Sequence, residues 1–212
     1  CALPISVRYE NALILVTDHN LNSINEMFPI LEIVARENKP FIIIGDPIEG
    51  ELLAALILNN TRGNMRIVAL KPPRYGEERK NILKDLALAT GATFVSRESG
   101  MLISEVKRQH LGSVKTIDSL KTMTTIVGGG GNYDEVEKRI EALKVEIANT
   151  QDMRECERIQ ERITRLASGI AIIKVGGLTE VDMIERKHRI EDALEAVKSA
   201  QMEGILPGGG TA

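Results

Sequence analysis

Few residues in this sequence of 212 have the types and spacing that chemistry at a site requires. One carboxylate to consider is Asp192, which follows Glu191 in a charged stretch with the pattern of a helix. Taken alone, such a pair is typical of a solvated helix face. The histidines and cysteines are not spaced like metal ligands, and the two cysteines do not indicate a disulfide framework. They are His19, His110, His188, Cys1 and Cys156. The sequence therefore predicts no metal site, and the histidines are expected to be surface residues.

Two glycine runs are candidates for phosphate-binding loops. Residues 128–131 are four consecutive glycines, but no Lys-Ser/Thr pair follows them and they come after a predicted hairpin strand, so we interpret them as a turn. Gly208, Gly209 and Gly210 are followed by two more residues, and a flexible tail is the simplest interpretation of such a run. The first residue is Cys1 rather than Met, and together with the terminal glycines this leads us to expect truncation at both ends.

Two predicted helices carry more apolar residues than one buried stripe needs. Phe28 and Leu31 lie three apart on the first helix. Leu53 and Ile57 lie four apart on the second, with Leu58 beside Ile57. One interpretation is that these stripes only face a sheet. The other is a second, exposed apolar face on each helix, in which case a groove between them would suit an extended or helical apolar segment.

The elements that position these residues alternate between strand and helix. Short apolar runs predict strands at 12–16, 41–44, 65–70 and 93–95. Helices are predicted from about Met27 to before Asn38, with Pro29 in the first turn, and at 50–61 and 77–89. Helices between short, continuously apolar strands indicate an α/β fold with a parallel sheet covered on both faces.

The second half of the chain has a different pattern. Residues 113–118 and 122–127 predict a β-hairpin. Apolar residues at helical spacing in 136–147 and 156–166 predict an αα-hairpin with charged outer faces. A strand is predicted at 170–175. A long connector helix follows, opened by a capping box at Thr179-Glu-Val-Asp182 and closed at Gly204. We therefore predict a mixed sheet flanked by helices, with the αα-hairpin and the connector helix added.

Composition excludes several classes of protein. Hydrophobic residues make up 43% and charged residues 27%, a balance typical of globular proteins, and Trp is absent. A net charge of −3 argues against a nucleic-acid partner. No apolar run approaches the roughly 20 residues that span a bilayer, and no secretory signal is expected. We expect a reducing compartment, the cytoplasm or an organellar matrix.

Several segments, in order from about Tyr9 to Ala212, together resemble the group I chaperonins of the GroEL family. The most specific are Val175-Gly-Gly-Leu-Thr-Glu180, Arg189-Ile-Glu-Asp-Ala-Leu194 and Gly204-Ile-Leu-Pro-Gly-Gly-Gly210. The others are Ile24-Asn-Glu-Met-Phe-Pro-Ile-Leu-Glu32, Lys39-Pro-Phe-Ile-Ile-Ile44, Glu49-Gly-Glu51, Asn59-Asn-Thr-Arg-Gly63 and Gly91-Ala-Thr-Phe-Val95. Pro72–Lys80 is a loose version of the family's Pro-Gly-Phe-Gly-Asp-Arg-Arg-Lys, which indicates a divergent member.

The resemblance implies a chaperone subunit that assembles into a homo-oligomeric ring. It implies that residues 1–168 belong to an apical, client-binding domain, 169–203 to the returning part of a small α+β intermediate domain, and 204–212 to the start of an equatorial, ATP-binding segment. Such a ring binds unfolded client proteins and a co-chaperonin lid, and it uses ATP and Mg²⁺ to drive encapsulated folding. The equatorial half with the family's Gly-Asp-Gly-Thr loop is not part of this sequence.

The resemblance also assigns roles to individual residues. Phe28, Leu31, Leu53, Ile57 and Leu58 correspond to apolar residues that bind clients and the co-chaperonin. Asp192 corresponds to the carboxylate that positions or activates the water attacking the γ-phosphate, a role that phosphoryl transfer needs. Gly208, Gly209 and Gly210 correspond to a loop beside the nucleotide, Gly169 to a hinge position preceded here by Ser168, and Glu180 to an inter-subunit ion pair. Charge at a helix N-terminus explains Glu180 equally well.

Three functions are therefore weighed. The first is a subunit of an ATP-driven folding chamber. The second is a holdase-like binding module in which residues 1–168 retain unfolded chains without ATP. The third, an unrelated α/β nucleotide-dependent enzyme, needs a phosphate loop after a strand, and the sequence has none.

Overall fold

The computed structural model describes residues 6–120, 123–167 and 175–205. The chain forms two compact units, Cys1–Ser168 and Gly169–Ala212, which are described separately below. The predicted hinge residue Gly169 and the glycines Gly208, Gly209 and Gly210 lie outside the described residues. The predicted strand at 170–175 also lies outside them, apart from Val175.

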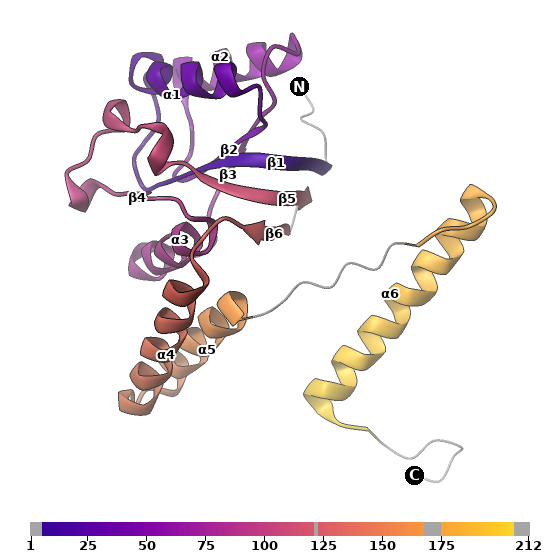
Figure 1. The fold of residues 1–212 in the computed structure, drawn as a ribbon. Coiled ribbons are helices and arrows are strands. Elements are labelled where there is room, and N and C mark those ends of the chain that lie inside the picture. Colours follow the sequence, from indigo (N-terminus) through magenta and orange to yellow (C-terminus); the bar gives the residue numbers. More distant parts are fainter. Residues whose placement is uncertain (1–5, 121–122, 168–174, 206–212) are drawn as a thin grey trace. The chain divides into compact units, whose positions relative to one another are not determined.

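The first unit alternates strands and helices and ends in two adjacent helices (Figure 1). Its strands are β1 (Ser6–Thr17), β2 (Phe41–Ile44), β3 (Ile67–Leu70), β4 (Phe94–Val95), β5 (Gly112–Leu120) and β6 (Thr124–Gly129). Its α-helices are α1 (Ile24–Glu37), α2 (Gly50–Thr61), α3 (Gly76–Thr90), α4 (Tyr133–Asn149) and α5 (Met153–Ala167). Three 3-10 turns connect β4 to β5, namely η1 (Arg97–Ser99), η2 (Ile103–Glu105) and η3 (Arg108–His110).

The strands form one mixed sheet, as predicted. Its order is β3-β2-β1-β5-β6, and β4 pairs with the end of β1. The pairs β1–β2, β2–β3 and β1–β4 are parallel, and each of the helices α1, α2 and α3 carries the chain from one of these strands to the next. The pairs β1–β5 and β5–β6 are antiparallel, and the second of these is the predicted hairpin. The α/β class with helices on a mixed sheet is therefore confirmed.

Two elements, β1 and α1, begin three or more residues earlier than the sequence predicted. β1 begins at Ser6 rather than at residue 12, because Ser6–Glu10 pairs with β5 although every second side chain in this part faces water. An apolar run cannot reveal such a half-exposed strand. α1 begins at Ile24 rather than near Met27, because Ile24 already packs against the core. Pro29 therefore lies in the second turn, where it has no N–H to donate to the preceding turn.

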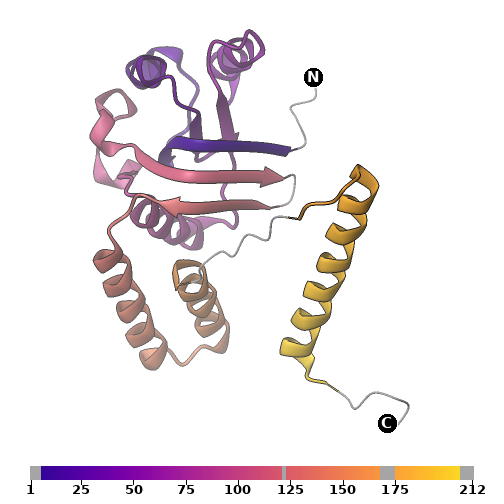
Figure 2. The same ribbon diagram turned by 45° about the vertical axis from the view of Figure 1, so that its right-hand side comes forward.

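Side chains on the central strands alternate between two cores. Leu13 and Leu15 of β1 point into a core shared with α1 and α2, while Ile14 and Val16 point into a core shared with α3. This alternation is the period of two that a strand imposes. Helices α1 and α2 therefore cover one face of the sheet and α3 covers the other, an arrangement that both ribbon views show (Figures 1 and 2).

The αα-hairpin of α4 and α5 has a small core of its own, made by Leu143, Ile159 and Ile163. A buried ion pair joins it to α3. Arg162 of α5 donates from Nε and Nη2 to the two carboxylate oxygens of Asp85, at 2.7 and 3.0 Å. Both residues are only 7% exposed. The two-pronged geometry fixes the angle at which α5 meets α3.

The glycine run 128–131 approaches the end of α3 closely. A Cβ at Gly131 would lie 2.0 Å from the carbonyl oxygen of Leu88, and one at Gly129 would lie 2.1 Å from that of Ala89. The N–H of Gly131 donates to the Ala89 carbonyl at 3.2 Å and so satisfies one end of the helix. The run ends β6 and leads into α4, so its glycines make room for the backbone and do not form a phosphate loop.

The second unit contains α6 (Glu180–Glu203). The Thr179 hydroxyl accepts a hydrogen bond from the N–H of Asp182 at 3.2 Å, so the predicted N-cap is present. The Asp182 carboxylate accepts from the N–H of Leu178 at 3.1 Å. The helix ends at Gly204, whose φ of 83° suits glycine. The predicted long helix therefore has the expected bounds.

The buried ion pair generates a prediction about stability. Replacing Arg162 by Leu leaves the Asp85 carboxylate buried with only Arg139, at 3.2 Å, as a partner. Breaking a buried pair in this way is expected to lower the free energy of unfolding by about 3 kcal/mol. Urea unfolding followed by circular dichroism measures this change.

The double variant Asp85→Leu with Arg162→Leu serves as the control. Since apolar pairs often replace buried ion pairs without loss, it is expected to recover most of the lost stability. A double variant as unstable as Arg162→Leu would show that the charges themselves hold the hairpin in place.

Candidate functional site

Helix α1 presents apolar side chains on more than its core-facing side. Met27, Ile30 and Val34, at steps of three and four, are buried against the sheet. Phe28 is 62% exposed, although it stands next to Met27 in the chain. Leu31 is half-buried and packs at the margin of the same core. The core face is therefore complete without Phe28.

Helix α2 repeats this arrangement with fewer core residues. Leu52 and Leu56 are buried, whereas Leu53 is 37% and Leu58 is 50% exposed. Ile57 is half-buried. Since Leu52 and Leu56 already face the sheet, the outward leucines contribute little to the core.

The two helices lie next to each other on the same face of the sheet (Figures 1 and 2). Their outward apolar side chains together define what we call the α1–α2 surface: Phe28, Leu31, Leu53, Ile57 and Leu58. Three of the five are exposed and two are half-buried, so none is sealed inside the unit. Large apolar side chains grouped on neighbouring helices can bind other apolar groups.

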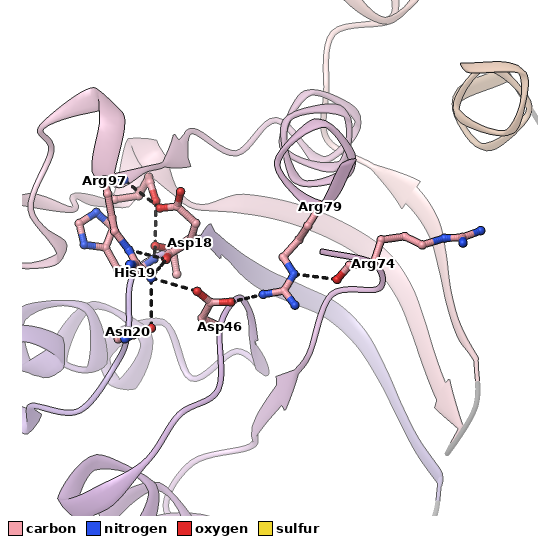
Figure 3. A network of polar contacts seen from close by, with 9 residues as sticks. Asp18, His19, Asn20, Asp46, Arg74, Arg79 and Arg97 are labelled. Carbon is pink, nitrogen blue, oxygen red and sulfur yellow. Dashed lines mark hydrogen bonds and ion pairs between the residues drawn. The ribbon is translucent and has the colours of Figure 1, made fainter. Parts of the chain in front are cut away.

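A polar cluster that the sequence did not predict joins the ends of the parallel strands (Figure 3). Arg97, after β4, donates to the carbonyl oxygen of Asp18 at 2.9 and 2.7 Å and to the carboxylate of Asp46 at 3.0 Å. Its backbone N–H donates to the Asp18 carboxylate at 2.8 Å. The guanidinium of Arg79 pairs with the other oxygen of Asp46 and donates to the carbonyl oxygen of Arg74.

This cluster borders a pocket of about 360 Å³ at the carboxyl ends of β1 and β2, where α/β sheets often bind ligands. Its lining carries three cationic side chains and three carboxylates. The pKa of Lys80 in this lining is raised, because its ammonium group donates hydrogen bonds to Glu98 and to Glu77. Since these charges pair with one another, we interpret the cluster as a structural network that holds the ends of the parallel strands together. The signal for it was polar residues directly after strands, in Asp18-His19-Asn20 and Gly45-Asp46.

The predicted site residues of the second unit stand on α6. The side chain of Asp192 is exposed, and among the described residues it makes no hydrogen bond or ion pair. Its neighbour Glu191 pairs instead with Lys187 at 3.3 Å. Glu180 is exposed in the first turn of α6, where its charge also favours the helix dipole.

The histidines differ in burial, and Nε2 of His19 is buried without a hydrogen-bond partner among the described residues. His188 is exposed, whereas His19 and His110 are half-buried rather than fully on the surface, and Nδ1 of His110 accepts from the Lys107 N–H. Within the described part of the chain, no three His, Cys, Asp or Glu side chains are arranged to hold a metal ion. No helix among the described residues is both long and apolar enough to cross a bilayer.

Comparison with known proteins agrees with the fold and with the motifs. Residues 12–212 match the sequence model of the TCP-1/cpn60 chaperonin family. The chain is also 43% identical over 201 residues to "Chaperonin GroEL" of Carsonella ruddii (strain PV). That alignment covers 95% of this chain and 38% of the relative, so the chain spans about two fifths of the relative's length. The chain belongs to the TCP-1/cpn60 chaperonin family, which confirms its resemblance to the group I chaperonins.

Proposed function

We propose that this chain is the client-binding part of a chaperonin subunit and that it binds non-native polypeptides on the α1–α2 surface. The observation that carries the proposal is the exposure of Phe28, Leu53 and Leu58 on adjacent helices whose core faces are already complete. Polar residues at these positions would serve the fold equally well, so the apolar side chains there fit a binding role.

The chemistry of the α1–α2 surface suits many clients. Apolar burial contributes about 25 cal/mol per Å² and has no direction, so the surface does not demand one sequence. Folded proteins hide most such side chains, whereas unfolded chains expose them. An extended or helical segment with apolar residues at regular spacing is the expected ligand, and the mobile part of a co-chaperonin lid would compete for the same residues.

The proposal also divides the chain into the domains that the family resemblance implies. Residues 1–168 would form the apical, client-binding domain, 169–203 the returning intermediate segment and 204–212 the start of the equatorial segment. Gly169 would then lie at the hinge. The exposed Glu180 would pair with a neighbouring subunit in a homo-oligomeric ring in the cytoplasm or an organellar matrix.

The nucleotide side of the proposal concerns Asp192. In the intact ring, ATP supplies the γ-phosphoryl group and Mg²⁺ neutralises its charge. The Asp192 carboxylate fits a role in orienting water, because it is exposed and has no partner among the described residues. Gly208, Gly209 and Gly210 would lie beside the nucleotide, and they fall outside the described part of the chain.

A second candidate function needs no ATP. The α1–α2 surface and the sheet that supports it lie entirely within the first unit. A chain that contains this unit could therefore hold unfolded proteins as a simple binding module, and client binding is expected without nucleotide.

The first test replaces exposed apolar residues of the α1–α2 surface. Each buried apolar side chain contributes about 1.5–3 kcal/mol, so Phe28→Ser with Leu58→Ser is expected to weaken client binding at least about tenfold. The measurement is the concentration of the 212-residue chain that halves the aggregation of a chemically unfolded client. Unfolding stability should change little, because both side chains are at least half exposed.

Tyr133→Ser with Val145→Ser is the matched control, since these residues are 77% and 61% exposed on α4. The control variant should suppress aggregation like the unmodified chain. Equal loss of aggregation suppression in both variants would indicate non-specific apolar binding. If neither variant lost suppression, the α1–α2 surface would have no part in client binding.

The second test concerns Asp192 in the full-length ring. Asp192→Asn keeps the size of the side chain but removes its charge, so ATP hydrolysis is expected to fall at least about tenfold while ATP affinity is retained. Glu191→Gln, one residue away and paired with Lys187, should hydrolyse ATP normally. Steady-state phosphate release gives the rates, and a normal rate in Asp192→Asn would exclude Asp192 from the reaction.

A further inference from the structure

A second pocket lies in the first unit between the sheet and the αα-hairpin. It encloses about 450 Å³, a volume in the range of small-molecule sites. Helix α3, the start of β6, the end of α5 and the loop after β3 form its walls. None of the residues of the α1–α2 surface lines it, so it is a separate site.

The walls are mainly apolar. Ile82 and Leu86 of α3, Ile126 of β6 and Leu166 of α5 all contribute, and all four are only half-buried. Leu86 and Ile126 stand at the margin of the core under the sheet, and Leu166 stands at the margin of the hairpin core. The pocket is therefore a gap between two cores, with apolar surface left uncovered on both sides.

The charged groups around the pocket are unbalanced. Its lining holds three cationic side chains, Lys71, Arg162 and Arg165, but one carboxylate, Asp85. Arg162 is neutralised by Asp85, and Arg165 pairs with Glu161 at 3.1 Å. Lys71 is exposed and makes no ion pair with any described residue. The pocket thus combines an apolar interior with an uncompensated positive charge.

We propose that this pocket binds an amphipathic monoanion, namely a medium-chain carboxylate. The alkyl chain would cover Ile82, Leu86 and Leu166, and the carboxylate would pair with Lys71. Burial of the alkyl chain supplies most of the affinity, and the ion pair supplies the preference for an anion. This proposal does not depend on the proposed chaperone function.

Binding would also join the hairpin to the sheet. The Asp85–Arg162 pair crosses this gap, and the apolar margins beside it line the pocket. A ligand that contacts both α3 and α5 favours the docked hairpin, so the melting temperature should rise with ligand concentration.

The test uses decanoate as the probe and isothermal titration calorimetry with the 212-residue chain as the measurement. We expect saturable binding at one site, weaker binding of decanol and the weakest binding of decylammonium. Lys71→Glu should weaken decanoate binding about fivefold and leave decanol unaffected, because only the charged head group contacts Lys71. Lys107→Glu, an equal charge change at an exposed lysine outside this pocket, should have no effect.

The α1–α2 surface is the competing site for an alkyl chain. Phe28→Ser with Leu58→Ser should leave decanoate affinity unchanged, whereas Leu86→Ala should weaken it. If the first pair abolishes binding and Leu86→Ala does not, the ligand sits on the α1–α2 surface and the proposal is wrong. Absence of saturable binding, or equal affinity for all three probes, would overturn it as well.

Discussion

Burial of the central strands on both faces is the constraint from which the first unit follows. No side chain of Ala12–Val16 or Phe41–Ile44 is more than 5% exposed. Each face of β1 and β2 therefore needs its own cover, which α1 and α2 provide on one side and α3 on the other. Covering the first face uses one narrow stripe of each helix. Phe28, Leu53 and Leu58 lie outside these stripes, so they are exposed on helices that the sheet supports.

The αα-hairpin is attached mainly by an ion pair rather than by apolar packing. Its own core is small, and its main link to α3 is the pair between Asp85 and Arg162. Buried ion pairs fix orientation well but add little net stability, because both charges lose water. The first unit thus combines a well-packed sheet and its covering helices with a hairpin whose orientation depends mainly on one buried ion pair. Local opening is expected to begin at the hairpin rather than at the sheet.

The sequence predicted those parts of the fold in which local pattern and packing agree. Continuous apolar runs marked β2 and the end of β1 because both are buried on two faces. The surplus of apolar residues on two helices left open whether they only face the sheet or also form an exposed face, and the exposure of Phe28 and Leu58 agrees with the second interpretation. The first half of β1 was missed because its exposed face is polar. The pairs Asp85–Arg162 and Asp18–Arg97 join residues far apart in the chain, and no local pattern encodes such contacts.

An exposed apolar surface favours contact with other apolar groups, including those of a second copy of the chain, so the charges near it matter. Exposed charges of both signs stand on the same two helices, with Glu26, Glu32 and Arg36 on α1, Glu51 on α2 and Arg62 directly after α2. The guanidinium of Arg36 pairs with the Glu32 carboxylate at 2.7 Å and offsets that charge alone. A partner with carboxylates opposite Glu26 and Glu51 would be repelled, whereas a less acidic apolar segment would meet less repulsion. The charges on these two helices therefore influence which apolar partners the surface accepts.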